Sequence, residues 1–274
     1  MKITVGLYQF DCREGERAGN RARVTDAARQ ARARGADLLA LPELWCSGYD
    51  LESASAEPGW ERELAFLADL SRETGIALLG GSLLEPLGGA PVEGAAGPRL
   101  ANCAIACEEG EERARYRKLH LFKPLGEARW LEAGDSRPRP FLLRGVRCAL
   151  SVCYDLRFPE LYRPLAADGV ELISVCAQWP LARIVHWRAL LVARAIEAQC
   201  YVLGVNRRGS FGEIEFGGSS LLVSPSGEIL VDAGEETGLF LGEVDSGAVA
   251  DHRDALPVLE DRRDDLYPIG GDAR

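Results

Sequence analysis

The stretch ALSVCYDLRFPEL (residues 149–161) places a thiol where a buried strand ends. The apolar run up to Val152 predicts the strand, and a helix is expected to begin near Phe158. Cys153 then lies at a strand-to-helix turn, where the helix dipole favours a thiolate and backbone N–H groups can bind an oxyanion. The alternative is a buried thiol without a chemical role, which is the usual state of a cysteine in an apolar segment.

The composition indicates a folded protein that does not bind nucleic acid. The 274 residues are 47% hydrophobic, and the net charge of −10 leaves no basic surface for a nucleic acid. No stretch approaches the roughly 18 apolar residues of a membrane span, and the N-terminus is predicted to be a strand rather than a signal peptide. We therefore expect a cytoplasmic protein without a membrane partner, whose eight cysteines are buried free thiols.

Strand and helix patterns alternate along the chain and predict an α/β protein with mixed sheets. Helices are predicted over residues 20–35, 59–75 and 182–199, and hairpins turn at residues 109–110, 144–145 and 225–227. The Gly- and Pro-rich residues 85–98 are predicted to form an exposed loop. A sheet with helices on one face leaves its other face bare, and packing two such sheets together would cover both. Residues 1–274 are predicted to form a single domain.

Two charged residues occupy positions similar to that of Cys153. Glu43 follows a buried strand in LALPELWCSGY (39–49), and Lys118 ends a hairpin strand in YRKLHLFKP (116–124). Taken singly, Glu43 would be an ordinary carboxylate in a turn, and Lys118 would be a solvated charge on the surface. Together they lie where strands leave the core, which is where active sites of α/β proteins collect. A Cys–His peptidase is the alternative, although the spacing favours none of the three histidines as a partner.

In this order the three motifs resemble those of the nitrilase superfamily, the carbon–nitrogen hydrolases with a Glu-Lys-Cys triad. The resemblance runs from KITVGLYQFD (2–11) to PVLEDRRDDLY (257–267), nearly the whole chain. It implies a four-layer α-β-β-α sandwich, a homodimer, and no metal or organic cofactor. A catalytically silent interaction protein on this fold is an alternative that an intact triad disfavours.

The resemblance also implies a role for each residue of the site. Cys153 would attack an amide carbon, and Glu43 would take the thiol proton and later deliver it to the leaving ammonia. Lys118 and the backbone N–H of Tyr154 would stabilise the tetrahedral oxyanion. Glu127, in PLGEARWLEAG (124–134), matches a second glutamate often found in these sites; otherwise it is a surface charge on a loop.

The sequence around the nucleophile resembles amidase branches of the superfamily rather than nitrilases proper. Residues 175–209 resemble the ω-amidase-like branch, in which a Trp-Pro pair follows the strand, here Trp179-Pro180. Gln178 stands where that branch commonly has asparagine, and its longer side chain is expected to reshape the pocket. The best prediction is an ω-amidase that acts on 2-oxoglutaramate or a similar small amide. The alternatives are an amidase for deaminated glutathione, which CYDLRFPEL also resembles, and an N-carbamoyl amino acid hydrolase.

A substrate that carries a carboxylate needs a dedicated cation, because the overall charge of the protein would repel it. The candidates near predicted strand ends are Arg157, Arg183, Arg207 and Arg208. Arg157 follows the nucleophile so closely that it could instead brace the turn by pairing with a carboxylate.

A homodimer interface is predicted on the long helix over residues 182–199. Apolar side chains stud this helix beside its arginines: Trp187, Leu190, Leu191 and Ile196. The helix after Cys153 and the C-terminal tail, residues 247–274 approximately, are expected to join the interface. The alternative is an ordinary helix that covers a sheet.

Overall fold

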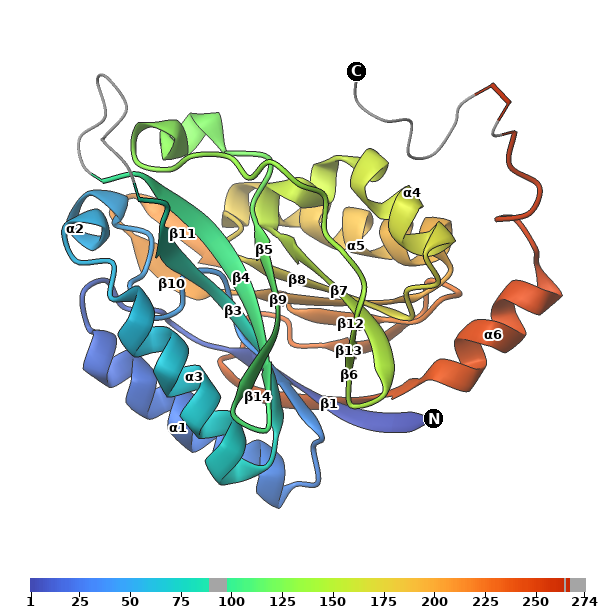
Figure 1. Cartoon of the computed structure of the whole chain (residues 1–274), viewed down its shortest axis with the longest axis horizontal. Helices are drawn as coiled ribbons and strands as arrows, with labels where there is room; N and C mark the ends of the chain where they lie inside the picture. The colour runs from blue at the N-terminus through green and yellow to red at the C-terminus, as the bar shows by residue number, and fades with distance from the viewer. Residues whose placement is uncertain (89–97, 264, 267–274) are drawn as a thin grey trace.

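A computed structural model shows two six-stranded mixed sheets packed face to face, with helices on the outer face of each (Figure 1). It describes residues 1–88, 98–263 and 265–266. The first sheet has the order β14-β1-β2-β3-β4-β5, and the second has the order β13-β12-β9-β8-β7-β6. Among the described residues, no helix combines the length and the apolar character needed to cross a bilayer.

The strands of each sheet surround a parallel centre. The first sheet contains β1 (Lys2–Gln9), β2 (Leu38–Ala40), β3 (Ala77–Pro86), β4 (Leu100–Glu108), β5 (Glu111–Arg117) and β14 (Gly238–Asp245). The second contains β6 (Phe141–Leu143), β7 (Val146–Val152), β8 (Leu172–Ala177), β9 (Tyr201–Asn206), β12 (Leu221–Val223) and β13 (Ile229–Asp232). Strands β1, β2 and β3 run parallel, as do β7, β8 and β9, and the flanking strands are antiparallel.

The helices complete a four-layer α-β-β-α sandwich, as the resemblance predicted. They are α1 (Arg17–Ala33), α2 (Leu51–Ala56), α3 (Trp60–Thr74), α4 (Pro159–Ala167), α5 (Ile184–Ala198) and α6 (Ser246–Ala255). Helices α1 and α3 cover the first sheet, and α4 and α5 cover the second. Leu39 faces α1 and α3 while its neighbours Leu38 and Ala40 face the other sheet, because side chains alternate along a strand. Both faces of the central strands are therefore apolar.

Three elements were not predicted from the sequence. The hairpin of β10 (Arg208–Phe211) and β11 (Ile214–Gly217) forms a separate two-stranded sheet, α2 is short, and α6 lies in the predicted tail. Asp245 begins α6 by accepting a hydrogen bond from the backbone N–H of Gly247. Most of the loop predicted over residues 85–98 lies outside the described residues, although β3 extends to Pro86.

The apolar face of α5 is divided between the core and the surface. Trp187 and Leu191 are fully buried against the second sheet, so the prediction that they contribute to a subunit interface is wrong. The long apolar side chains of an amphipathic helix turn toward its own sheet first. Ile196 is half exposed, and Leu190 is partly buried.

A bulge in β3 supports the turn that carries Glu43. The register of β3 against β4 shifts between Leu79 and Ser82, and Gly81 there has a φ of +61°. A Cβ atom at Gly81 would lie 2.0 Å from the carbonyl oxygen of Pro42. The hydroxyl of Ser82 accepts a hydrogen bond from the backbone N–H of Leu44 at 3.0 Å. The turn at residues 42–45 therefore rests directly on the bulge.

We expect the substitution Gly81→Ala to destabilise the protein more than Gly75→Ala does. Gly75 ends α3 with a φ of +64°, but it has no atom within 4 Å of an added Cβ. Gly75→Ala should lower the free energy of unfolding by about 1–2 kcal/mol, the cost of a left-handed alanine. Gly81→Ala adds a backbone clash to the same strain. Equal losses in urea unfolding would contradict this role of the bulge.

Candidate active site

Glu43 is held at the end of β2 by donors from three directions. Its side chain is fully buried. Oε1 accepts hydrogen bonds from Lys118 Nζ at 2.9 Å and from Asn102 Nδ2 at 2.7 Å, and Oε2 accepts one from the backbone N–H of Gln178 at 2.8 Å. A carboxylate has about four acceptor sites, so Oε2 keeps one for a further proton donor. This geometry suits a general base.

Lys118 joins two carboxylates in the interior. The side chain is fully buried directly after β5, and Nζ lies 2.9 Å from Glu43 Oε1 and 2.7 Å from Glu127 Oε1. Burial lowers the pKa of Lys118, but the negative charges of Glu127 and Glu43 outweigh it and raise this pKa well above its usual value. An ammonium has three N–H donors, so one remains after both carboxylates are bound.

Glu127 is a buried partner of Lys118, which rules out the alternative of a surface charge on a loop. It begins the short 3₁₀ helix η2 (Glu127–Arg129), which follows η1 (Lys123–Leu125). Oε1 accepts a hydrogen bond from Tyr49 Oη at 2.5 Å, and Oε2 accepts one from the backbone N–H of Phe122 at 2.6 Å. Both oxygens are therefore fixed, and Lys118 cannot draw the carboxylate toward Glu43.

Cys153 directly follows β7 and begins the 3₁₀ helix η3 (Cys153–Arg157), which leads into α4. Its φ of +46° is left-handed, which costs a non-glycine residue about 1–3 kcal/mol and occurs mostly at functional sites. Asp155 supports the turn from inside. Its Oδ2 accepts hydrogen bonds from Tyr116 Oη at 2.9 Å and from the backbone N–H of Val152 at 3.3 Å.

Burial and nearby negative charge favour the neutral thiol of Cys153. Burial is the largest influence on Cys153, and the charge of Glu43 adds to it, so the pKa of the thiol is raised well above its usual value. Lys118 opposes the shift without reversing it. A thiol in this state needs a base that removes its proton as it attacks. Glu43 is the carboxylate with the strongest effect on this pKa and has a free acceptor site.

The histidines do not supply that base. His120 Nδ1 lies 2.8 Å from Asp155 Oδ1, and its ring stacks on Phe158 with centroids 3.6 Å apart. His186 is exposed on α5 and contacts Arg157. The structure gives no contact between Cys153 and a histidine of the described chain. A Cys–His pair is therefore not formed.

Cys153 opens into a small cavity that contains most of the predicted substrate-binding residues. The lining residues are Phe122, Cys153, Tyr154, Arg157, Gln178, Trp179, Pro180 and Arg183. The guanidinium of Arg157 lies 4.8 Å from the ring centroid of Trp179, and that of Arg183 lies 5.8 Å from the ring centroid of Phe122. Neither arginine forms an ion pair with a carboxylate of the described residues, so the brace considered for Arg157 is absent.

Arg207 does not line this cavity, contrary to the prediction that it could meet the substrate. It is fully buried after β9 and pairs with Glu14 at 2.5 Å and with Asp11 at 3.1 Å. Both carboxylates come from the loop between β1 and α1. These carboxylates lie more than 190 residues away in sequence, so no local pattern indicated the pairing. The ion pairs compensate the charge of Arg207 inside the protein.

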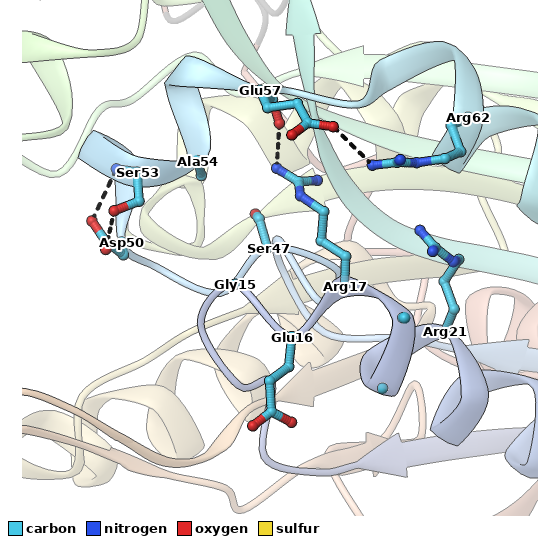
Figure 2. Close-up of a pocket in the computed structure, with 12 residues that line it drawn as sticks. Gly15, Glu16, Arg17, Arg21, Ser47, Asp50, Ser53, Ala54, Glu57 and Arg62 are labelled. Carbon is cyan, nitrogen blue, oxygen red and sulfur yellow. Dashed lines mark hydrogen bonds and ion pairs between the residues drawn. The ribbon is translucent and has the colours of Figure 1, made fainter.

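A second cavity, of about 610 Å³, lies at the start of α1 and beside α2 (Figure 2). Figure 2 shows Arg17 directed at the backbone of Glu57, with which it forms a hydrogen bond, while Arg62 approaches the Glu57 carboxylate. Arg21 pairs at 2.6 Å with Glu63 beneath the surface. The arginines here already have acidic or carbonyl partners, and no residue of this cavity lines the one at Cys153.

Three supporting residues were missed by the sequence analysis: Tyr49, Asn102 and Asp155. Each side chain bonds a residue far away in sequence, so only the assembled sheets reveal its role. Asp155 carried one signal, its place two residues after Cys153. The described residues contain no cluster of three or more acidic, Cys or His side chains able to hold a metal ion. All eight cysteines are free and buried, as predicted.

Comparison with known proteins identifies similar sequences and folds. A model of the carbon–nitrogen hydrolase family matches residues 4–254. The 2-oxoglutaramate amidase of Bacillus subtilis (strain 168) is 35% identical over 269 residues, which are 97% of this chain and 100% of that protein. The deaminated glutathione amidase of Synechocystis sp. (strain PCC 6803 / GT-S) is 34% identical over 243 residues, 84% of this chain and 87% of that protein.

A solved structure shows a similar fold together with a modified cysteine. A variant of the amidase from Nesterenkonia sp. AN1 is 29% identical, with a TM-score of 0.83 over 97% of this chain and 95% of that chain. That structure shows covalent addition of the acetamide moiety of fluoroacetamide at its active site cysteine.

We expect no thiolate signal from Cys153 near pH 8.5, the usual pKa of cysteine. The measurement is the difference in ultraviolet thiolate absorbance between the wild type and Cys153→Ser during a pH titration. In Glu43→Gln the pKa of Cys153 should fall toward its usual value, because the negative charge that most raises it is gone. A wild-type thiolate that forms at or below about pH 8.5 would contradict the neutral resting thiol.

Proposed function

The chain belongs to the carbon–nitrogen hydrolase family, and from this premise we propose that it hydrolyses a small ω-amide of a dicarboxylic or 2-oxo acid, such as 2-oxoglutaramate. The predicted superfamily and fold are confirmed by the family match and by the similar structure. The protein is an enzyme that cleaves a carbon–nitrogen bond other than a peptide bond. The observation that most supports the proposal is the buried Glu43–Lys118–Glu127 cluster, together with two arginines that line the cavity at Cys153 and have no carboxylate partner among the described residues.

The first half of the proposed reaction forms a thioester. Cys153 Sγ bonds to the amide carbon as Glu43 takes the thiol proton, and the carbonyl electrons move onto oxygen. The third N–H of Lys118 and the backbone N–H of Tyr154 stabilise that oxyanion. When the intermediate collapses, the C–N bond breaks and Glu43 returns the proton to nitrogen, so ammonia leaves.

The second half restores the thiol. Glu43 takes a proton from a water molecule, whose oxygen attacks the thioester carbon, and the same donors hold the second oxyanion. The C–S bond then breaks, and the sulfur regains its proton from Glu43. The balance is one amide and one water converted to one carboxylic acid and one ammonia. Glu127 touches neither atom that reacts; it fixes the position and charge of Lys118.

We assign the selection of acidic substrates to the two arginines that line the cavity at Cys153. A carboxylate on the far end of the substrate would meet Arg157, held over Trp179, or Arg183, held near Phe122. The relatives named as 2-oxoglutaramate amidases support this substrate class. Deaminated glutathione is the second candidate, because a relative that acts on it matches at 34% identity.

We also propose a homodimer in the cytoplasm. Exposed apolar side chains on α5, such as Val185 and Ile196, and Leu256 just after α6 support a subunit interface. Eight free cysteines suit a reducing compartment.

The substrate assignment predicts which variants lose discrimination. Arg157→Ala or Arg183→Ala should raise KM about tenfold or more for succinamate or 2-oxoglutaramate, equivalent to roughly 1.4 kcal/mol. KM for an uncharged amide of equal length should stay unchanged in both. Arg188→Ala is the matched control, because Arg188 lies on α5, which begins directly after Arg183, but pairs with Asp232. The ω-amidase assignment fails if the wild type prefers the neutral amide; release of ammonia from deaminated glutathione would then be tested next.

The dimer is tested by sedimentation velocity at about micromolar concentration, where affinities of about −8 kcal/mol suffice for association. We expect a species of about twice 29.8 kDa, and Ile196→Asp should shift it toward monomer. Leu142→Asp changes an equally exposed apolar residue on β6 and serves as the control. A monomeric wild type at this concentration would refute the dimer.

A further inference from the structure

Gln178 holds Glu43 at two points. Its backbone N–H donates to Glu43 Oε2 at 2.8 Å, and its side-chain Nε2 donates to the backbone oxygen of Glu43, also at 2.8 Å. Gln178 directly follows β8, in the second sheet, whereas Glu43 follows β2 in the first sheet. These two bonds therefore connect the two sheets at the point where the carboxylate lies.

Arg207 holds the other end of the Gln178 amide. Its Nη1 donates to Gln178 Oε1 at 2.9 Å, and its backbone N–H donates to the carbonyl oxygen of Ala177 at 3.0 Å. The same side chain is anchored by Glu14 and Asp11, by the carbonyl oxygen of Ser210 at 2.9 Å, and by the ring of Phe216 at 4.6 Å. A fully buried, multiply bonded guanidinium is a rigid support.

The two contacts fix the orientation of the Gln178 amide. An amide that donates from Nε2 and accepts at Oε1 cannot flip without breaking both bonds. Asparagine is one methylene shorter and could not span the gap between Arg207 and the Glu43 backbone without movement of one of them. The amide thus links an ion-paired arginine outside the cavity to the backbone of Glu43, and the backbone N–H of the same Gln178 bonds the Glu43 carboxylate.

We propose that Arg207 and Gln178 are positioning residues, which act as one unit to aim the Glu43 carboxylate at the nucleophile. The proposal rests on the proposed role of Glu43 as general base. Arg207 does not touch substrate in this arrangement, because the cavity at Cys153 excludes it. Its positive charge serves to hold Gln178 rather than to bind a substrate carboxylate.

Two single variants and their combination test the unit. Gln178→Met removes both side-chain bonds but leaves Arg207 paired with Glu14 and Asp11. Arg207→Lys keeps a charge for those carboxylates but loses the planar fork that reaches Gln178. Arg208→Lys is the matched control, since the neighbouring Arg208 pairs with Glu235 away from the cavity. Thermal unfolding of each variant identifies any that fails to fold. If Arg207→Lys does not fold, Gln178→Met still tests the proposal.

Steady-state kinetics with an acidic and a neutral amide give the decisive readouts. We expect each single variant to lower kcat about 10- to 100-fold for both amides with KM nearly unchanged, as a small misplacement of a catalytic group does. The double variant should lose no more than the worse single variant, because the residues act together.

Other results separate the possible failures. A rise in KM confined to the acidic amide in Arg207→Lys would overturn the proposal and return Arg207 to substrate binding. A wild-type kcat in Gln178→Met would also overturn it. Glu43→Gln is measured beside them. If that variant keeps full activity, the proposed function itself is wrong; if it is inactive while the others resemble the wild type, only the positioning role is wrong.

Discussion

The ammonium of Lys118, buried between two carboxylates, is the interaction on which the rest of the site depends. Its Nζ lies 2.9 Å from Glu43 Oε1 and 2.7 Å from Glu127 Oε1, and all three side chains are fully buried. Removing one partner of such a buried group typically costs about 3–5 kcal/mol, because a charge remains without compensation. Tyr49 and Asn102 donate to the oxygens that Lys118 binds, and the backbone N–H groups of Phe122 and Gln178 satisfy the other two. The same negative environment that holds the lysine charged keeps the Cys153 thiol neutral.

The site forms where the two sheets of the sandwich meet. Glu43 and Lys118 leave strands of the first sheet, and Cys153 and Gln178 leave strands of the second. Neither sheet alone holds the complete site. The bulge at Gly81 and the hydrogen bonds of Asp155 support the two turns that carry Glu43 and Cys153, so strain at the turn of Cys153 is compensated by buried hydrogen bonds.

Much of the fold could be predicted from periodicity, because long helices and strands with apolar faces leave a regular pattern of apolar residues in the sequence. Leu67 and Leu70 of α3 are buried as the helical spacing predicted, and Glu43, Lys118 and Cys153 converge as their strand ends predicted. What could not be predicted was the choice of partners. Arg207 looked free to meet a substrate, yet Glu14 and Asp11 lie beside it only after β1 and β9 come together. Trp187 looked available for a partner subunit, yet its own sheet covers it. Such pairings depend on tertiary contacts that no local pattern records.

The central claim, that Cys153 reacts with the amide carbon with help from the buried cluster, is tested most directly by acid quenching during turnover. Peptides from the quenched enzyme are then analysed by mass spectrometry. The peptide that contains Cys153 should gain the mass of the substrate less that of ammonia, and the adduct should be absent from Cys153→Ser. Steady turnover in Cys153→Ser, or an acyl adduct on another of the eight cysteines, would contradict the claim.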